Sequence, residues 1–85
     1  MEFIKLPHSI YSKNEHGRIL AEIRFPEKEQ GIFNIQSTYV ADEYIGSEVP
    51  GQLVEMAVES IRAQHGRIEA ECPFASKYLK ERHII

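Results

Sequence analysis

Two short stretches of this sequence combine residue types that proteins use for catalysis and ligand binding. The first holds the only cysteine, Cys72, which is followed by Pro73 and Phe74. A thiol that solvent reaches can act as a nucleophile, whereas an unpaired cysteine on an apolar strand is more often a small core residue. Both interpretations of Cys72 are open at this point, and the first predicts a reactive thiol that is partly accessible.

The second stretch runs from Asp42 to Gly51 and precedes residues with the periodicity of a helix. The first amides of a helix lack partners within the helix, and the helix dipole is positive at that end. A helix start is therefore suited to bind an anion. The alternative is an ordinary connection between a strand and a helix, in which Ser47 caps the helix.

The other polar residues form no recognisable catalytic or metal site. No two histidines stand four residues apart, and no cysteine lies at metal-ligand spacing from a histidine, so we expect no bound metal. The histidines are His8, His16, His65 and His83. The glycine motifs of nucleotide-binding loops and the G-x-S-x-G motif of hydrolases are also missing.

The first half of the chain has the patterns of strands. Residues 18–25 alternate between apolar and polar side chains, and residues 32–40 are rich in β-branched and aromatic types. We expect these two segments to pair as an antiparallel hairpin around a polar turn at residues 27–31. The opening residues, from Phe3 to Tyr11, add one or two more strands.

The second half changes to helical periodicity. Residues 48–65 carry an apolar stripe that predicts a long amphipathic helix, with Gly66 as its C-terminal cap. Residues 67–72 predict a strand, and residues from Phe74 to about Arg82 a final helix. A strand, a long helix and a strand imply that residues 67–72 run parallel to residues 32–40. The fold class predicted is α+β (α/β), mainly an antiparallel sheet with one parallel strand pair.

Composition sets limits on function. The 85 residues suit one domain, 42% are hydrophobic and 27% charged, and these are ordinary globular values. A net charge of −3 argues against nucleic acid as a partner. No apolar run reaches the roughly 18–20 residues of a membrane span, and the N-terminus does not resemble a signal peptide. The single thiol fits a reducing compartment, so we expect a cytoplasmic protein with no membrane partner.

Taken together, three elements of the chain resemble the GNAT superfamily of N-acetyltransferases. They are Thr38-Tyr39-Val40, the loop at 44–51 before the helix with Leu53, and Cys72-Pro73-Phe74-Ala75. The chain is most similar to the smallest single-domain branch of that superfamily, where a Thr-x-Val strand precedes a glycine-rich loop and a long helix. The next strand in that branch ends in Cys-Pro-Phe or Cys-Ser-Phe. The resemblance covers about residues 17–82.

The resemblance implies one GNAT-like domain over residues 1–85, with a splayed parallel strand pair that leaves a V-shaped opening. It implies an acetyl-CoA-dependent N-acetyltransferase that acts on an unknown amine, with Cys72 as the candidate catalytic residue. Binding of acetyl-CoA, or of coenzyme A, is implied for Thr38, Val40, Gly46, Ser47, Val49, Gly51 and Phe74.

The loop departs from the superfamily pattern Q/R-x-x-G-x-G/A. In an alignment on Leu53, Ile45 stands at the leading basic or amide position, Glu48 at the central glycine and Pro50 at the closing small residue. A carboxylate then lies where a phosphate is expected, and a proline removes one amide donor. The departure predicts weak coenzyme A binding. It also leaves open an alternative, a catalytically inactive GNAT-like domain that serves as an interaction or acyl-CoA-sensing module.

Overall fold

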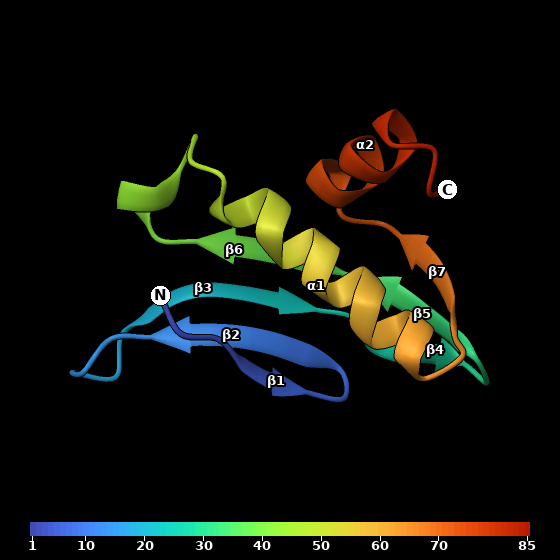
Figure 1. Ribbon diagram of the computed structural model, residues 1–85, viewed down its shortest axis with the longest axis horizontal. Helices are drawn as coiled ribbons and strands as arrows, with labels where there is room; N and C mark the ends of the chain where they lie inside the picture. Colours follow the sequence, from blue (N-terminus) through green and yellow to red (C-terminus); the bar gives the residue numbers. More distant parts are fainter.

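The computed structural model describes residues 1–85, and its strands and helices follow one another as the sequence patterns predict (Figure 1). The strands are β1 (Ile4–Leu6), β2 (Ser9–Lys13), β3 (Ile19–Arg24), β4 (Glu27–Glu29), β5 (Ile32–Ile35), β6 (Ser37–Val40) and β7 (Arg67–Ala70). The helices are a short 3-10 turn, η1 (Asp42–Tyr44), the long helix α1 (Val49–Ala63), and α2 (Pro73–Glu81). The fold is α+β, as predicted. None of the helices has the length and apolar character needed to cross a membrane.

The strands form two sheets. The first has the order β1-β2-β3-β6 and is antiparallel throughout; the second has the order β4-β5-β7, with β7 parallel to β5. The predicted hairpin is confirmed, because Ala21 pairs with Val40 and Arg24 pairs with Ser37. The turn at 27–31 is shorter than expected, since its first three residues form β4 against β5.

The predicted strand at 32–40 is divided at Gln36, where the chain passes from one sheet to the other. The Gln36 N–H donates to the carbonyl of Arg24, which lies at the end of β3. The carbonyl of Ile35 instead accepts the N–H groups of Glu71 and Cys72, at 3.2 and 3.1 Å. The partners change within two residues, so β6 and β7 separate from this point onward.

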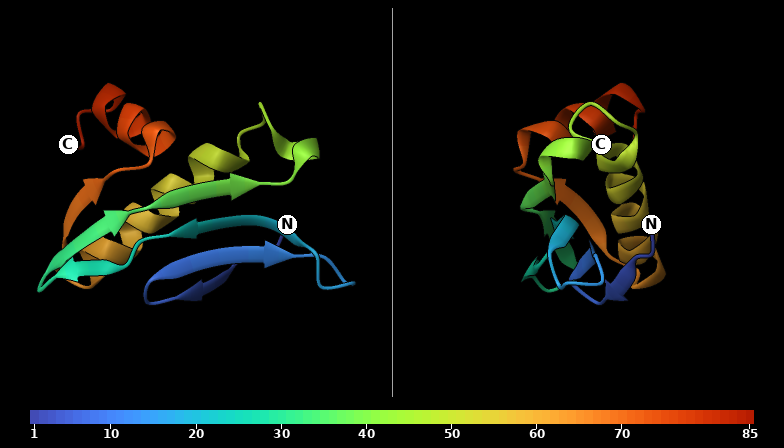
Figure 2. Two further views of the ribbon diagram at one scale, coloured as in Figure 1. Left: turned by 180° about the vertical axis from the view of Figure 1, so that it is seen from behind. Right: turned by 90° about the vertical axis from the view of Figure 1, so that its left-hand side faces the viewer.

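One face of both sheets is covered by α1, which contacts β2, β3, β6 and β7 (Figure 2). The apolar stripe predicted from the sequence is the buried face of this helix. It consists of Leu53, Val54, Ala57, Val58 and Ile61. These side chains pack in one core with residues from the strands and α2, namely Ile10, Ala21, Ile23, Phe25, Phe33, Ile35, Cys72, Ala75 and Leu79.

The end of α1 differs from the prediction that Gly66 caps it. The N–H of Gly66 does donate to the Ile61 carbonyl at 2.9 Å, and the N–H of His65 donates to Arg62 at 3.0 Å. These are the two bonds of a Schellman motif, in which the left-handed residue is usually glycine. Here that residue is His65, with a φ of 57°. Gly66 is required for another reason, because a Cβ there would overlap the Phe33 ring.

His65→Gly is therefore expected to stabilise the protein by about 0.5–1 kcal/mol, because glycine adopts the left-handed conformation without the steric cost that a side chain brings. Chemical denaturation with circular dichroism measures the change. Arg62→Gly, three residues before His65 and within the helix, is the matched control and should cost about 1 kcal/mol. A destabilisation of the same size in both variants would contradict the expectation.

Candidate functional site

The edges of β6 and β7 face one another without pairing. Each is the last strand of its sheet, and α2 contacts both. In Figure 1 the two strands diverge toward α2. Their separation begins at Ile35. The splayed pair expected from the sequence is therefore present: β7 pairs with β5, whereas β6, the continuation of β5 along the chain, belongs to the other sheet.

Backbone polar groups line the free edge of β6. The N–H of Ala41 donates to Leu20 across the antiparallel ladder with β3. Residues alternate along such a ladder between those that bond to the neighbouring strand and those that point away from it. Thr38 and Val40 each stand an odd number of residues from Ala41, so they belong to the set that does not bond to β3. Their N–H and C=O groups therefore point away from β3, toward the side of β7.

Cys72 lies at the junction of β7 and α2, and it is the N-cap residue of α2. Its Sγ is 3.5 Å from the Thr38 Oγ1, so the thiol joins the free edge of β6 to the start of α2. Only 8% of the residue is exposed. The prediction of a partly accessible thiol is therefore wrong, because the Cys72 side chain lies on the inner face with Ile68 and Ala70 and packs into the core.

The loop before α1 is held by its own hydrogen bonds. The Ser47 hydroxyl donates to the Tyr44 carbonyl at 2.6 Å and accepts the N–H of Val49 at 3.2 Å. The N-cap of α1 is Glu48, not Ser47 as one prediction had it, and Glu48 makes no side-chain capping bond. A capping side chain bonds to the second or third helical amide, and the second residue here is Pro50, which has none.

Two amides at this helix start have no protein acceptor, those of Glu48 and Gly51. Of the helix-start amides that the sequence predicts to bind an anion, these two are the ones left free to do so.

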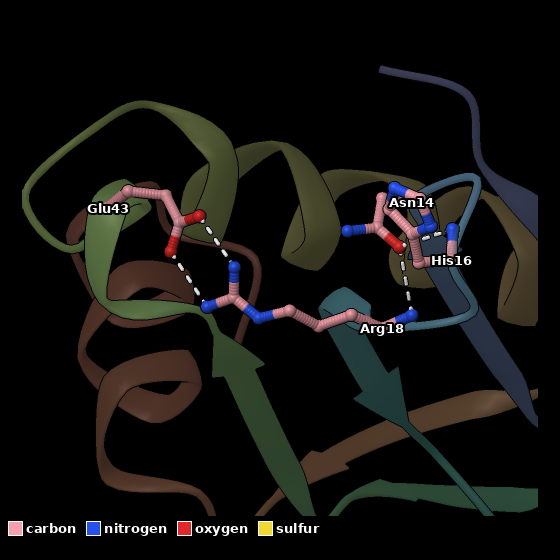
Figure 3. Close-up of polar contacts among 4 residues, drawn as sticks. All are labelled: Asn14, His16, Arg18 and Glu43. Carbon is pink, nitrogen blue, oxygen red and sulfur yellow. Dashed lines mark hydrogen bonds and ion pairs between the residues drawn. The ribbon is translucent and has the colours of Figure 1, made fainter.

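An ion pair fastens the same loop to the start of β3 (Figure 3). Both terminal nitrogens of Arg18 donate to the Glu43 carboxylate, at 2.8 and 2.9 Å. The hydrogen bonds from Arg18 hold the pKa of Glu43 below its ordinary value. Asn14 in turn holds the turn before Arg18, because its Oδ1 accepts the N–H groups of His16 and Arg18, both at 2.9 Å. The position of the loop is thereby tied to β3.

A cavity of about 460 Å³ lies between the start of α1 and the outer face of α2. Three of the residues predicted to bind acetyl-CoA line it, namely Ser47, Gly51 and Phe74. Tyr78 forms its wall against Gly51, where an added Cβ would stand 2.9 Å from the Tyr78 Cε2. The other predicted residues lie outside it. Gly46 is on an exposed turn, Val49 packs against the core, and Thr38 and Val40 lie on β6.

The lining of this cavity carries more negative than positive charge. Glu48, Glu55 and Glu81 contribute carboxylates, and Arg82 is the one cationic residue. The Arg82 guanidinium stacks on the Tyr78 ring, 3.6 Å from its centroid. Burial, together with the neighbouring Glu55 carboxylate, raises the pKa of Tyr78.

Tyr78 and Arg82 are not among the residues that the sequence predicts to bind acetyl-CoA. The signal was available, because Phe74, Tyr78 and Arg82 are spaced four residues apart and share one face of a helix. The ring centroids of Phe74 and Tyr78 are 5.9 Å apart in the structure.

Comparison with known proteins agrees with this architecture. Residues 9–84 match the family described as GCN5-related N-acetyl-transferase. The solution structure of a GCN5-like protein from Staphylococcus aureus, assigned as an N-acetyltransferase, is similar, with a TM-score of 0.75 and 30% identity. The similarity covers 95% of this chain and 79% of that one. No curated protein matches the chain significantly. The chain belongs to the GCN5-related N-acetyltransferase family, the GNAT superfamily that its sequence elements resemble.

Proposed function

We propose that the protein transfers the acetyl group of acetyl-CoA to an amine, with the thioester placed between β6 and β7. The observation that carries the proposal is the free edge of β6, with Thr38 and Val40, directly beside the thiol of Cys72. Family membership supports the reaction class. No observation favours the alternative of a module that only binds partners or senses acyl-CoA.

The residues present fit the pantetheine arm of coenzyme A better than they fit its pyrophosphate. The pantetheine arm is rich in amides, and a free strand edge binds such a chain as an added strand would be bound. The start of α1 offers the amides of Glu48 and Gly51 to a pyrophosphate, but the carboxylates of Glu48, Glu55 and Glu81 oppose it. We therefore expect the donor to be held mainly by its arm.

Cys72 is proposed to carry the acetyl group between the two substrates, because its thiol lies 3.5 Å from the Thr38 Oγ1 on β6. In the first step the Cys72 sulfur attacks the thioester carbonyl carbon of acetyl-CoA, the carbon–sulfur bond to coenzyme A breaks, and the thiol proton passes to the departing thiolate. In the second step the amine nitrogen attacks the carbonyl carbon of the acetyl–cysteine thioester, the carbon–sulfur bond to Cys72 breaks, and one amine proton passes to the Cys72 thiolate.

Acetyl-CoA binding and turnover test the proposal together. At a concentration well above its Kd, acetyl-CoA should stabilise the fold by about 2–4 kcal/mol in thermal unfolding. Mixtures with spermidine, a lysine-containing peptide or hydroxylamine should yield acetylated product by mass spectrometry. Neither stabilisation nor product, at millimolar acetyl-CoA, would contradict the proposed function.

Glu48→Gly is expected to tighten coenzyme A binding about tenfold, which corresponds to about 1.4 kcal/mol. A unit charge pair about 6 Å apart, at an effective dielectric near 20, repels by roughly 3 kcal/mol, and salt lowers this to roughly 1–2 kcal/mol. Glu48→Gln should recover part of the gain, because it removes the charge and keeps the side-chain size. Titration calorimetry measures the three affinities.

Glu59→Gln is the matched control, since Glu59 is exposed on α1 but does not line this cavity. It should leave the affinity within about twofold of the parent, as exposed charges at a distance are screened. Equal affinities for all four proteins would mean that the pyrophosphate does not bind at the start of α1.

A further inference from the structure

A buried amide occupies the middle of β5. Asn34 is 8% exposed, and its neighbours in the strand, Phe33 and Ile35, are buried apolar residues. Burying an amide is costly unless its polar groups are hydrogen-bonded. The bonds that Asn34 makes therefore indicate what this position does.

Both ends of the Asn34 amide bond to the same residue, Glu71. The Nδ2 donates to the Glu71 Oε1 at 2.7 Å, and the Oδ1 accepts the Glu71 N–H at 3.1 Å. The Glu71 N–H has a second acceptor, the carbonyl of Ile35 at 3.2 Å, so the main chain there is paired without Asn34. The contact that only Asn34 supplies is the one to the carboxylate. Asn34 thus fixes the position of an exposed carboxylate.

That carboxylate lies beside the point where β6 and β7 separate. Glu71 follows the last residue of β7 and precedes Cys72. Side chains alternate along a strand, so Glu71 is on the face opposite Ala70 and Cys72, away from the helices. The thiol and the carboxylate therefore approach the separation of the strands from opposite faces.

A hollow of about 280 Å³ opens on this outer face, lined by Lys28, Asn34, Glu69, Ala70 and Glu71. Lys28 donates to Glu69 at 2.7 Å, which neutralises that carboxylate. Glu71 makes no ion pair. It is the carboxylate of the hollow that has a hydrogen-bond donor but no cation at ion-pair distance, although Lys28, which is paired with Glu69, is close enough to attract it as well.

We infer that Glu71 binds the acceptor amine as an ammonium ion on this outer face, and that Asn34 is its positioning residue. The inference rests on the proposed function and names the acceptor class as a primary amine that is cationic in solution. The bound ammonium loses one proton to solvent water. The free amine then attacks the thioester carbon, the carbon–sulfur bond breaks, and the second nitrogen proton goes to the departing thiolate.

Binding of the amine is measured first without any acetyl donor. The probe is the amide of Nα-acetyl-lysine, titrated while the nitrogen-15 signals of the Asn34 side chain and the Glu71 backbone are followed by NMR.

Glu71→Gln keeps the size and the oxygen that Asn34 bonds, and removes only the charge. It should weaken binding about tenfold or more, since a charge-assisted contact is lost. Glu59→Gln, exposed on α1 and outside this hollow, is the matched control and should bind as the parent does. Equal binding by the parent and Glu71→Gln, or equal weakening in both variants, would overturn the inference.

Steady-state kinetics separates a role in binding the amine from a structural one. Glu71→Gln should raise the KM for the lysine amide about tenfold and leave the KM for acetyl-CoA within about twofold. With hydroxylamine, an acceptor that is largely uncharged at neutral pH, Glu71→Gln should match the parent. Asn34→Ala, checked for folding by circular dichroism, should raise the amine KM less than Glu71→Gln does. Equal losses with both acceptors would indicate a structural role and would overturn the inference. If the parent acetylates no amine at all, the proposed function fails, and the NMR titration alone decides whether Glu71 binds ammonium.

Discussion

Cys72→Ser is expected to lower the rate of acetyl transfer to an amine by at least about 100-fold, because a hydroxyl is a far weaker nucleophile than a thiol at the same position. Serine is only slightly smaller than cysteine and can still bond to the Thr38 hydroxyl, whose oxygen lies 3.5 Å from the Cys72 Sγ. The loss should therefore appear in chemistry and not in folding. Intact-mass spectrometry after mixing with acetyl-CoA should find one added acetyl group on the parent protein and none on the variant.

Two further variants separate the thiol from its surroundings. Cys72→Ala removes the nucleophile and should lose as much activity as Cys72→Ser. Thr38→Val keeps the shape and removes the hydroxyl, so it should keep the acetyl adduct and lose activity by about tenfold or less, the value of one hydrogen bond. Activity of Cys72→Ser close to that of the parent would show that the amine attacks acetyl-CoA directly and that Cys72 only lines the site.

The burial of Cys72 bears on how that test is done. With 8% of the residue exposed, acetylation requires the start of α2 to move so that the thiol is uncovered. The adduct should accordingly form more slowly than on an unfolded chain at the same pH. Rapid alkylation of the folded protein would show that the site opens readily in solution.

The elements of the fold were predictable because their signals are local. Alternation in residues 18–25 and the apolar stripe from Leu53 to Ile61 each depend on neighbours within a few residues. The division of 32–40 at Gln36 was not predictable in this way. It arises because two residues far apart in sequence bond to adjacent backbone groups of one strand, Arg24 to the Gln36 N–H and Glu71 to the Ile35 carbonyl.

The candidate site divides along the same line. Cys72-Pro73-Phe74 and Thr38-Tyr39-Val40 were found as short motifs, and the structure brings Cys72 to Thr38. Asn34 and Glu71 were missed, since they stand 37 residues apart and meet only through the parallel pairing of β5 with β7. The one local signal was a polar amide within the apolar segment Ile32-Phe33-Asn34-Ile35, which argued for a specific partner.

Gly66→Ala is expected to destabilise the protein by about 2–3 kcal/mol, which is at the upper end of the usual cost of overpacking. A Cβ at this position would overlap the Phe33 ring and stand 3.0 Å from the Ile61 Cγ2. Neither neighbour has room to move, because Phe33 is 3% exposed and Ile61 is fully buried. The strain is steric and not conformational, since Gly66 does not have a positive φ.

Gly17→Ala provides the contrast, because Gly17 has a φ of +83° with nothing within 4 Å of an added Cβ. It should cost about 1–2 kcal/mol from backbone strain alone. Phe33→Leu distinguishes the two mechanisms. In that background the larger ring is gone, so Gly66→Ala should cost at least about 1 kcal/mol less than in the parent, whereas the cost of Gly17→Ala should not change. Equal costs of Gly66→Ala in both backgrounds, in a double-mutant cycle by chemical denaturation, would contradict the packing argument.

Gly66→Ala also links the packing of Phe33 to the candidate functional site. Gly66 precedes β7, and the N–H of Arg67 begins the pairing with β5 through the Gly31 carbonyl at 2.7 Å. A displaced Phe33 shifts the strand that carries Asn34 and, through β7, the residue before Cys72. We therefore expect Gly66→Ala to lower acetyl transfer even at temperatures where the variant is fully folded, and Phe33→Leu to restore part of it. Unchanged transfer by folded Gly66→Ala would show that the positions of Glu71 and Cys72 do not depend on this contact.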